Sequence, residues 1–118
     1  MHLLIIITFS SKTLSDSSLI LDNLKIEKGF KIEIFAENID TPRQIAESDA
    51  GNIFVGSRSA GTISVIDSKG SMRVIVEGLS NSTGVTYHDN DLYFSEVNSI
   101  WKISNIDEKL LKSDSIFE

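Results

Sequence analysis

Short runs of alternating hydrophobic and polar residues follow one another along most of the chain. In the stretch FKIEIFAENI, Ile32, Ile34 and Ala36 fall on one side of an extended backbone, which predicts a strand over residues 31–37. Further runs are short, rich in β-branched or aromatic residues and bounded by turn formers: NIFVGSR, TISVID, MRVIVEGL, GVTYH, DLYFSEV and SIWKISNID. The pattern predicts an all-β fold, in which only IDEKLLKSD, residues 106–114, is typical of a helical turn.

Turn-forming residues divide these runs into hairpins. The segments 49–52, 67–70 and 88–91 are rich in Asn, Asp and Gly, which tolerate the positive φ angles of tight turns. Pro42 is expected in a connection, where its missing N–H group removes no bond from a strand ladder.

The runs repeat with a period of about 40 residues. Glu37 aligns with Glu77 and Ile45 with Val85, and after small deletions Phe54 aligns with Tyr93 and Ile63 with Ile100. A repeat of four strands in about 40 residues is typical of a β-propeller blade. An ordinary antiparallel sandwich also has regular short strands, but the loop-by-loop correspondence favours a partial β-propeller of about two four-stranded blades.

The strand order predicts which loops lie together. Strands alternate in direction within a blade, so the loop between the second and third strands shares one face with the connection to the next blade. That face receives Arg43, Arg58, Asn81, Glu96 and Asn98. Because propellers bind ligands where such loops converge, Arg43, Arg58 and Glu96 are candidate residues of a ligand-binding rim at the mouth of the channel.

Structural roles remain open for these residues. Arg58 is also suited to join neighbouring blades, with Glu96 as its ion-pair partner, and Asn81 and Asn98 are common turn formers. His88 falls in a hairpin on the opposite face and is interpreted as structural, and Asp89-Asn90-Asp91 is interpreted as a turn rather than part of a calcium loop.

The first 18 residues are set apart from the repeat. Leu3 to Phe9 is an apolar run too short to span a bilayer, with the length of the hydrophobic region of a signal peptide. We expect residues 1–18 to be a leader and the protein to be periplasmic or secreted, although a buried first strand would also explain the run. Residues 24–118 are assigned to the propeller, and a ring needs further blades, so we expect the native protein to be longer.

Composition narrows the possible functions. A net charge of −6 and three scattered arginines make nucleic-acid binding unlikely, because phosphate neutralisation needs clustered cations. The absence of cysteine excludes a disulfide, a thiol nucleophile and a cysteine metal site. No nucleotide-binding, nucleophile-elbow or zinc-protease motif occurs, so no catalytic residue and no metal ligand is assigned.

Two longer stretches resemble the glucose/sorbosone dehydrogenase family, which contains PQQ-dependent sugar dehydrogenases. They are KGFKIEIFAENIDTPRQIAESDAGNIFVGSRSAGTISVID and GLSNSTGVTYHDNDLYFSEVNSIWKISNID, and together they span about residues 24–110. The resemblance implies the N-terminal part of a six-bladed propeller that binds PQQ and calcium and oxidises an aldose or sorbosone.

The resemblance also implies where the chemistry lies. Hydride passes from the sugar to the quinone while a histidine removes a proton, and that histidine and the main cofactor and metal ligands are expected after residue 118. Arg43, Arg58 and Glu96 match family positions near the channel face. The 118 residues alone are therefore expected to be inactive.

Two other functions remain open. A calcium-dependent lactonase would need carboxylate and amide ligands at the channel, for which Glu96 and Asn98 are the candidates. A non-enzymatic binding module of the cell envelope would lack the downstream histidine.

Overall fold

The computed structural model describes residues 21–112, so the predicted leader over residues 1–18 lies outside the described residues. The chain divides into two compact units, Met1–Asp40 and Thr41–Glu118, and each is considered by itself. Within the described part of the chain, no helix is both long enough and apolar enough to cross a bilayer.

The described part of the first unit, residues 21–40, contains no strand. The prediction of a strand over residues 31–37 is therefore wrong. Extended backbone becomes a strand only where a neighbouring strand pairs with it, and none of the described strands pairs with this segment. Alternation alone does not supply the partner.

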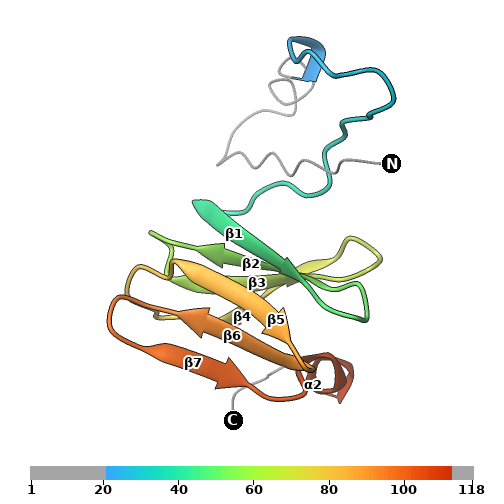
Figure 1. Cartoon of the computed structure of the whole chain (residues 1–118). Helices are drawn as coiled ribbons and strands as arrows, with labels where there is room; N and C mark the ends of the chain where they lie inside the picture. The colour runs from blue at the N-terminus through green and yellow to red at the C-terminus, as the bar shows by residue number, and fades with distance from the viewer. Residues whose placement is uncertain (1–20, 113–118) are drawn as a thin grey trace. The chain divides into compact units, whose positions relative to one another are not determined.

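The second unit contains two antiparallel sheets, stacked one above the other in Figure 1. The first sheet has the order β1 (Pro42–Glu47), β2 (Ile53–Ser57), β3 (Thr62–Ile66) and β4 (Met72–Val76). The second has the order β5 (Gly84–His88), β6 (Asp91–Ser95) and β7 (Ile100–Ile103), and helix α2 (Ile106–Lys112) follows it. The all-β prediction, the hairpin order and the helical turn near residue 106 are confirmed.

Local turn chemistry fixes the hairpins. Asp89 and Asn90 have φ angles of 49° and 67°, and Gly70 has a φ angle of 82°. Such angles suit Asn, Asp and Gly, and they reverse the chain within two residues between β5 and β6 and within five residues between β3 and β4. The segment 89–91 is a turn, as predicted.

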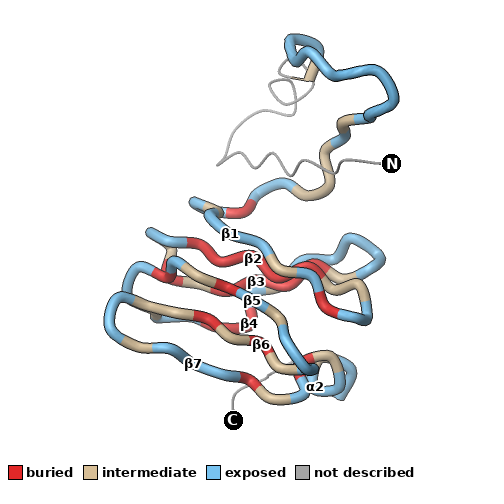
Figure 2. Tube along the Cα trace, viewed as in Figure 1, coloured by how far each residue is buried: buried red, intermediate tan, exposed pale blue. Residues whose placement is uncertain are grey.

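Alternation along each strand directs one set of apolar side chains between the two sheets. Phe54 and Leu92 are completely buried there, and Ile63, Val85 and Phe94 are also buried (Figure 2). Ile106, the first residue of α2, joins the same core. Sheet-on-sheet packing around these residues holds the two repeats together and fixes the relative positions of their loops.

Candidate functional site

Three loops and the start of β1 meet at one end of the stacked sheets, on the left in Figure 1. We call this end the loop face; it consists of residues 41–43, 58–61, 77–83 and 96–99. Backbone hydrogen bonds join its parts: Arg58 N donates to Thr41 O (3.2 Å), Leu79 N to Gly61 O (2.9 Å) and Val97 N to Ser80 O (3.1 Å). The prediction that these loops share one face is confirmed.

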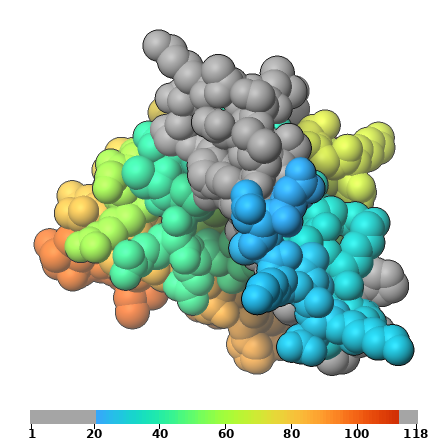
Figure 3. All heavy atoms as spheres, turned by 90° about the horizontal axis from the view of Figure 1, so that it is seen from above, coloured from blue at the N-terminus to red at the C-terminus, as the bar shows by residue number. Residues whose placement is uncertain are grey.

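Arg43 occupies a β-bulge at the start of β1. Pro42 pairs with Ser57 and Gln44 pairs with Gly56, so Arg43 is an extra residue without a partner opposite it. A bulge redirects the side chain and is frequent beside active sites. The Arg43 side chain is exposed, and the β1–β2 region, teal to green, forms part of the surface in Figure 3.

Arg58 begins the turn between β2 and β3, where its backbone N–H is bound but its guanidinium is exposed. Neither Arg58 nor Arg43 forms a salt bridge with any residue in the described range 21–112. The loop face thus presents two exposed guanidinium groups that form no ion pair with a described carboxylate.

Glu96 is half-buried, and both of its carboxylate oxygens accept hydrogen bonds from other residues of the protein. Its Oε2 accepts a hydrogen bond from Ser80 N (2.9 Å), and its Oε1 accepts one from Trp101 Nε1 (3.0 Å). These bonds, the first above all, lower the pKa of Glu96 below its ordinary value of 4.5, while desolvation acts in the opposite direction. The ion pair with Arg58 considered from the sequence is not formed, because Glu96 links the 77–83 connection to β7 instead.

The ionised carboxylate of Glu96 should therefore contribute to stability in acid. A carboxylate whose folded pKa is depressed contributes stability that is complete above its unfolded pKa and is lost as the pH falls through the folded pKa. We expect the Tm of the wild-type chain to fall more steeply between about pH 5 and pH 3 than that of Glu96→Gln, by a few degrees. Thermal unfolding followed by circular dichroism at a series of pH values measures the difference.

Glu77→Gln is the matched control, since Glu77 is an exposed carboxylate of the same loop face that makes no hydrogen bond within the described residues. It should keep the wild-type pH dependence. Parallel curves for wild type and Glu96→Gln would contradict the role given to Glu96.

The other residues considered from the sequence, Asn81, Asn98 and His88, have positions that fit structural roles. Asn81 has a φ angle of 50° and forms a turn, and Asn98 Oδ1 accepts a 3.3 Å hydrogen bond from Ser99 Oγ. His88 lies at the opposite end of the sheets, where its Nε2 is 3.2 Å from the Asp89 carboxylate. His88 is thus absent from the loop face, in agreement with its structural interpretation.

Two features at or beside the loop face could not be predicted from the sequence. The Arg43 bulge depends on register, which only the paired structure reveals. In addition, the hydroxyl groups of Ser57 and Ser82 are buried without a hydrogen-bond partner in the described structure. Ser82 belongs to the loop face and Ser57 lies directly before it, and buried hydroxyls are normally satisfied by protein or water.

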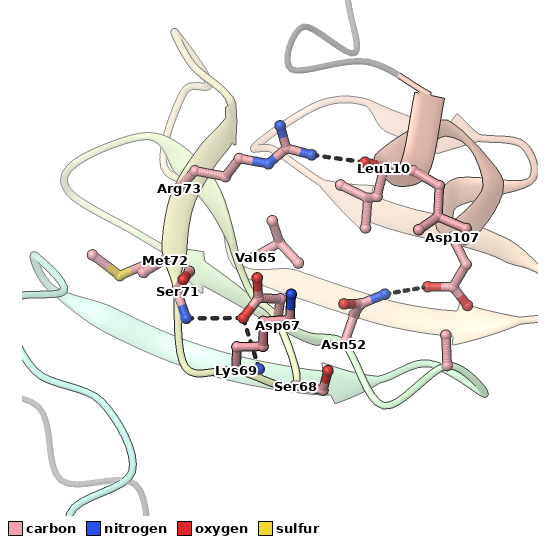
Figure 4. Close-up of a pocket in the computed structure, with 12 residues that line it drawn as sticks. Asn52, Val65, Asp67, Ser68, Lys69, Ser71, Met72, Arg73, Asp107 and Leu110 are labelled. Atoms are coloured by element: carbon pink, nitrogen blue, oxygen red, sulfur yellow. Dashed lines mark hydrogen bonds between the residues drawn. The ribbon is translucent and has the colours of Figure 1, made fainter.

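A cavity of about 520 Å³ lies at the opposite end, between the β3–β4 turn and α2 (Figure 4). Arg73 donates a 3.2 Å hydrogen bond to Leu110 O across it, and Asn52 Nδ2 donates a 2.7 Å bond to Asp107 Oδ1. Ser48 Oγ donates to the same Asp107 oxygen at 2.7 Å. These bonds attach α2 to the first sheet, away from the loop face.

Between residues 21 and 112, no three His, Asp or Glu side chains gather closely enough to hold a metal ion. The loop face carries two exposed guanidinium groups, Arg43 and Arg58, which are able to bind an anion, and two carboxylates, Glu77 and Glu96.

No family model matches the chain. An uncharacterized protein of Borreliella burgdorferi is 39% identical over 95 residues, which cover 80% of this chain and 25% of that protein. The chain therefore spans about a quarter of the length of this relative.

Two solved structures are similar to the chain. A streptogramin B lyase structure aligns with 57% of this chain and 24% of its own at a TM-score of 0.51 and 21% identity. The PQQ-bound aldose sugar dehydrogenase of Streptomyces coelicolor aligns with 58% of this chain and 25% of its own at a TM-score of 0.46 and 23% identity.

The likeness to the streptogramin B lyase structure concerns the fold alone. The stacked antiparallel sheets, the strand order within them and the repeated loop positions agree with the blade repeat expected from the sequence. The first repeat has four strands and the second has three within the described residues. The chain therefore forms a partial β-propeller.

Proposed function

We propose that the chain contributes part of the ligand-binding face of a PQQ-dependent sugar dehydrogenase. The supporting observation is that the family-like segment GNIFVGSRSAG, residues 51–61, carries Arg58 to the loop face, where Arg43 also lies. Neither arginine has an ion-pair partner in the described structure. Unpaired guanidinium groups at converging propeller loops are suited to an anionic ligand.

PQQ fits this electrostatic environment, because it is a quinone with three carboxylates. Arg43 and Arg58 would hold carboxylate groups of the cofactor, and PQQ when bound would supply the quinone that accepts hydride from the sugar. Glu96 would contribute indirectly, since its carboxylate is occupied by Ser80 and Trp101 and fixes the loops beside the arginines.

This chain's share of the activity is thus binding and orientation. The described residues contain no metal-ligand cluster for calcium, and His88 lies at the far end of the sheets. The proton acceptor and the calcium ligands would come from other parts of a complete enzyme.

Direct binding tests the proposal without requiring catalysis. The 118-residue chain is dialysed against PQQ, and bound quinone is measured by absorbance. Arg58→Gln and Arg43→Gln should each weaken binding about fivefold, which is the effect of losing one exposed charge pair. Binding should also weaken as the salt concentration rises.

Lys69→Gln is the matched control, because it removes one positive charge from an exposed turn at the opposite end. It should leave PQQ binding unchanged. Equal weakening by all three substitutions would indicate nonspecific attraction, and no measurable binding by the wild-type chain would overturn the proposed contribution to PQQ binding.

A further inference from the structure

Two asparagines of the chain are followed directly by serine, in the pairs Asn81-Ser82 and Asn98-Ser99. An asparagine loses its amide group when the backbone nitrogen of the next residue attacks its Cγ atom, and a small following residue leaves that approach open. The other asparagines precede leucine, isoleucine or aspartate, whose side chains are larger. Both Asn-Ser pairs belong to the loop face, which therefore presents the same dipeptide in two different environments.

The Asn98-Ser99 pair has its reacting groups accessible. Asn98 is exposed, and its Oδ1 accepts the 3.3 Å hydrogen bond from Ser99 Oγ. Ser99 N, the attacking atom, donates no hydrogen bond to any group in the range 21–112. The turn around the pair is held in place, since Glu96 N donates to Ser99 O (3.0 Å) and Val97 N donates to Ser80 O (3.1 Å). The amide carbonyl of Asn98 is thus polarised by a hydroxyl beside an unbound nucleophile.

The Asn81-Ser82 pair lacks this arrangement. Asn81 is exposed, but Ser82 is completely buried and its hydroxyl has no hydrogen-bond partner in the described structure. Ser82 Oγ lies 3.8 Å from the position that a Cβ atom on Gly56 would occupy, so this hydroxyl is packed against the first sheet. It does not polarise the Asn81 carbonyl, and burial separates Ser82 N from the water that must take up its proton. Asn81 is therefore an internal comparison for Asn98.

We infer that Asn98 is a site of spontaneous deamidation that Ser99 assists. Ser99 N gives its proton to water or hydroxide and forms a bond to Asn98 Cγ, while Ser99 Oγ–H stabilises the negative charge that develops on Oδ1. The bond between Cγ and Nδ2 then breaks, ammonia leaves, and a cyclic succinimide joins the two residues. One water molecule opens this ring at either carbonyl and leaves aspartate or isoaspartate, with no change of oxidation state.

Both products change the loop face. Each adds a negative charge to the 96–99 turn, and isoaspartate also lengthens the main chain of the turn by one methylene group. Two hydrogen bonds join this turn to the 77–83 connection, from Val97 N to Ser80 O and from Ser80 N to the Glu96 carboxylate. The reaction therefore weakens the contact between these two segments as the protein ages.

Incubation of the folded chain compares the two pairs directly. The 118-residue chain is kept at neutral pH below its Tm, and a second sample is kept in a urea concentration that unfolds it. Cleavage after Glu77, Glu96 and Glu108 places Asn81 and Asn98 in separate peptides, in which tandem mass spectrometry measures the conversion. In the folded chain Asn98 should convert more than about tenfold faster than Asn81, whereas the two rates should be similar in urea.

Ser99→Ala tests the hydroxyl group. The folded rate at Asn98 divided by the rate in urea should fall about fivefold in this variant, because the hydrogen bond to the developing charge is lost. Ser82→Ala is the matched control, since it removes a hydroxyl without a partner in the described structure, and it should leave the rate at Asn98 unchanged. Circular dichroism melting verifies that both variants are folded. Equal folded rates at Asn98 and Asn81, or a wild-type ratio in Ser99→Ala, would overturn the inference.

Discussion

Replacing Gly61 with alanine is expected to destabilise the sheet-containing unit by about 3–4 kcal/mol. Gly61 has a φ angle of 64°, and an added Cβ atom would lie 2.2 Å from Leu79 O. Both atoms of this clash are attached to backbone, so no side-chain rotation relieves it. The substitution would separate the β2–β3 turn from the β4–β5 connection and break the 2.9 Å bond from Leu79 N to Gly61 O.

Gly70→Ala distinguishes the clash from the cost of the backbone angle. Gly70 has a φ angle of 82°, but a Cβ atom there would meet nothing within 4 Å. Its replacement should cost only about 1–2 kcal/mol. Urea unfolding followed by the fluorescence of Trp101, the single tryptophan, measures both variants. Equal losses for Gly61→Ala and Gly70→Ala would show that the loops of the loop face are not held together as described.

The closeness of Gly61 to Leu79 also shows where sequence reasoning succeeds. Alternation and turn chemistry predicted the hairpins correctly because both are local properties of the chain. The repeat then placed the 58–61 and 77–83 segments on one face, since strand direction within a blade follows from counting hairpins.

Features that depend on pairing between distant residues were not predictable in the same way. Residues 31–37 have strand-like alternation, yet they form no strand in the described structure. Arg43 was selected because of its loop position, but its bulge arises from the register of β1 against β2. For Glu96, charge alone pointed to Arg58 as a partner, whereas the folded chain brings Ser80 N and Trp101 Nε1 to the carboxylate.

Truncation of Phe54 to alanine should give a loss of stability of about 3–5 kcal/mol, comparable with that of Gly61→Ala or larger. Phe54 is completely buried and belongs to the core that joins the two sheets. Its removal leaves a cavity between them, and the surrounding strands are restrained on both sides by their ladders, so the cavity cannot collapse fully.

Phe54→Leu separates loss of volume from loss of the aromatic ring. Leucine retains most of the apolar contact area and should cost less than about 1.5 kcal/mol if the site repacks. Because Trp101 lies on the second sheet, its fluorescence and the circular dichroism of both sheets should change at the same urea concentration in the wild type. In Phe54→Ala the midpoints of the fluorescence and circular dichroism transitions should shift together to a lower urea concentration. A transition of Trp101 that stays at its wild-type midpoint would show that the second sheet does not depend on the first, and that the packing around Phe54 does not fix the loop face.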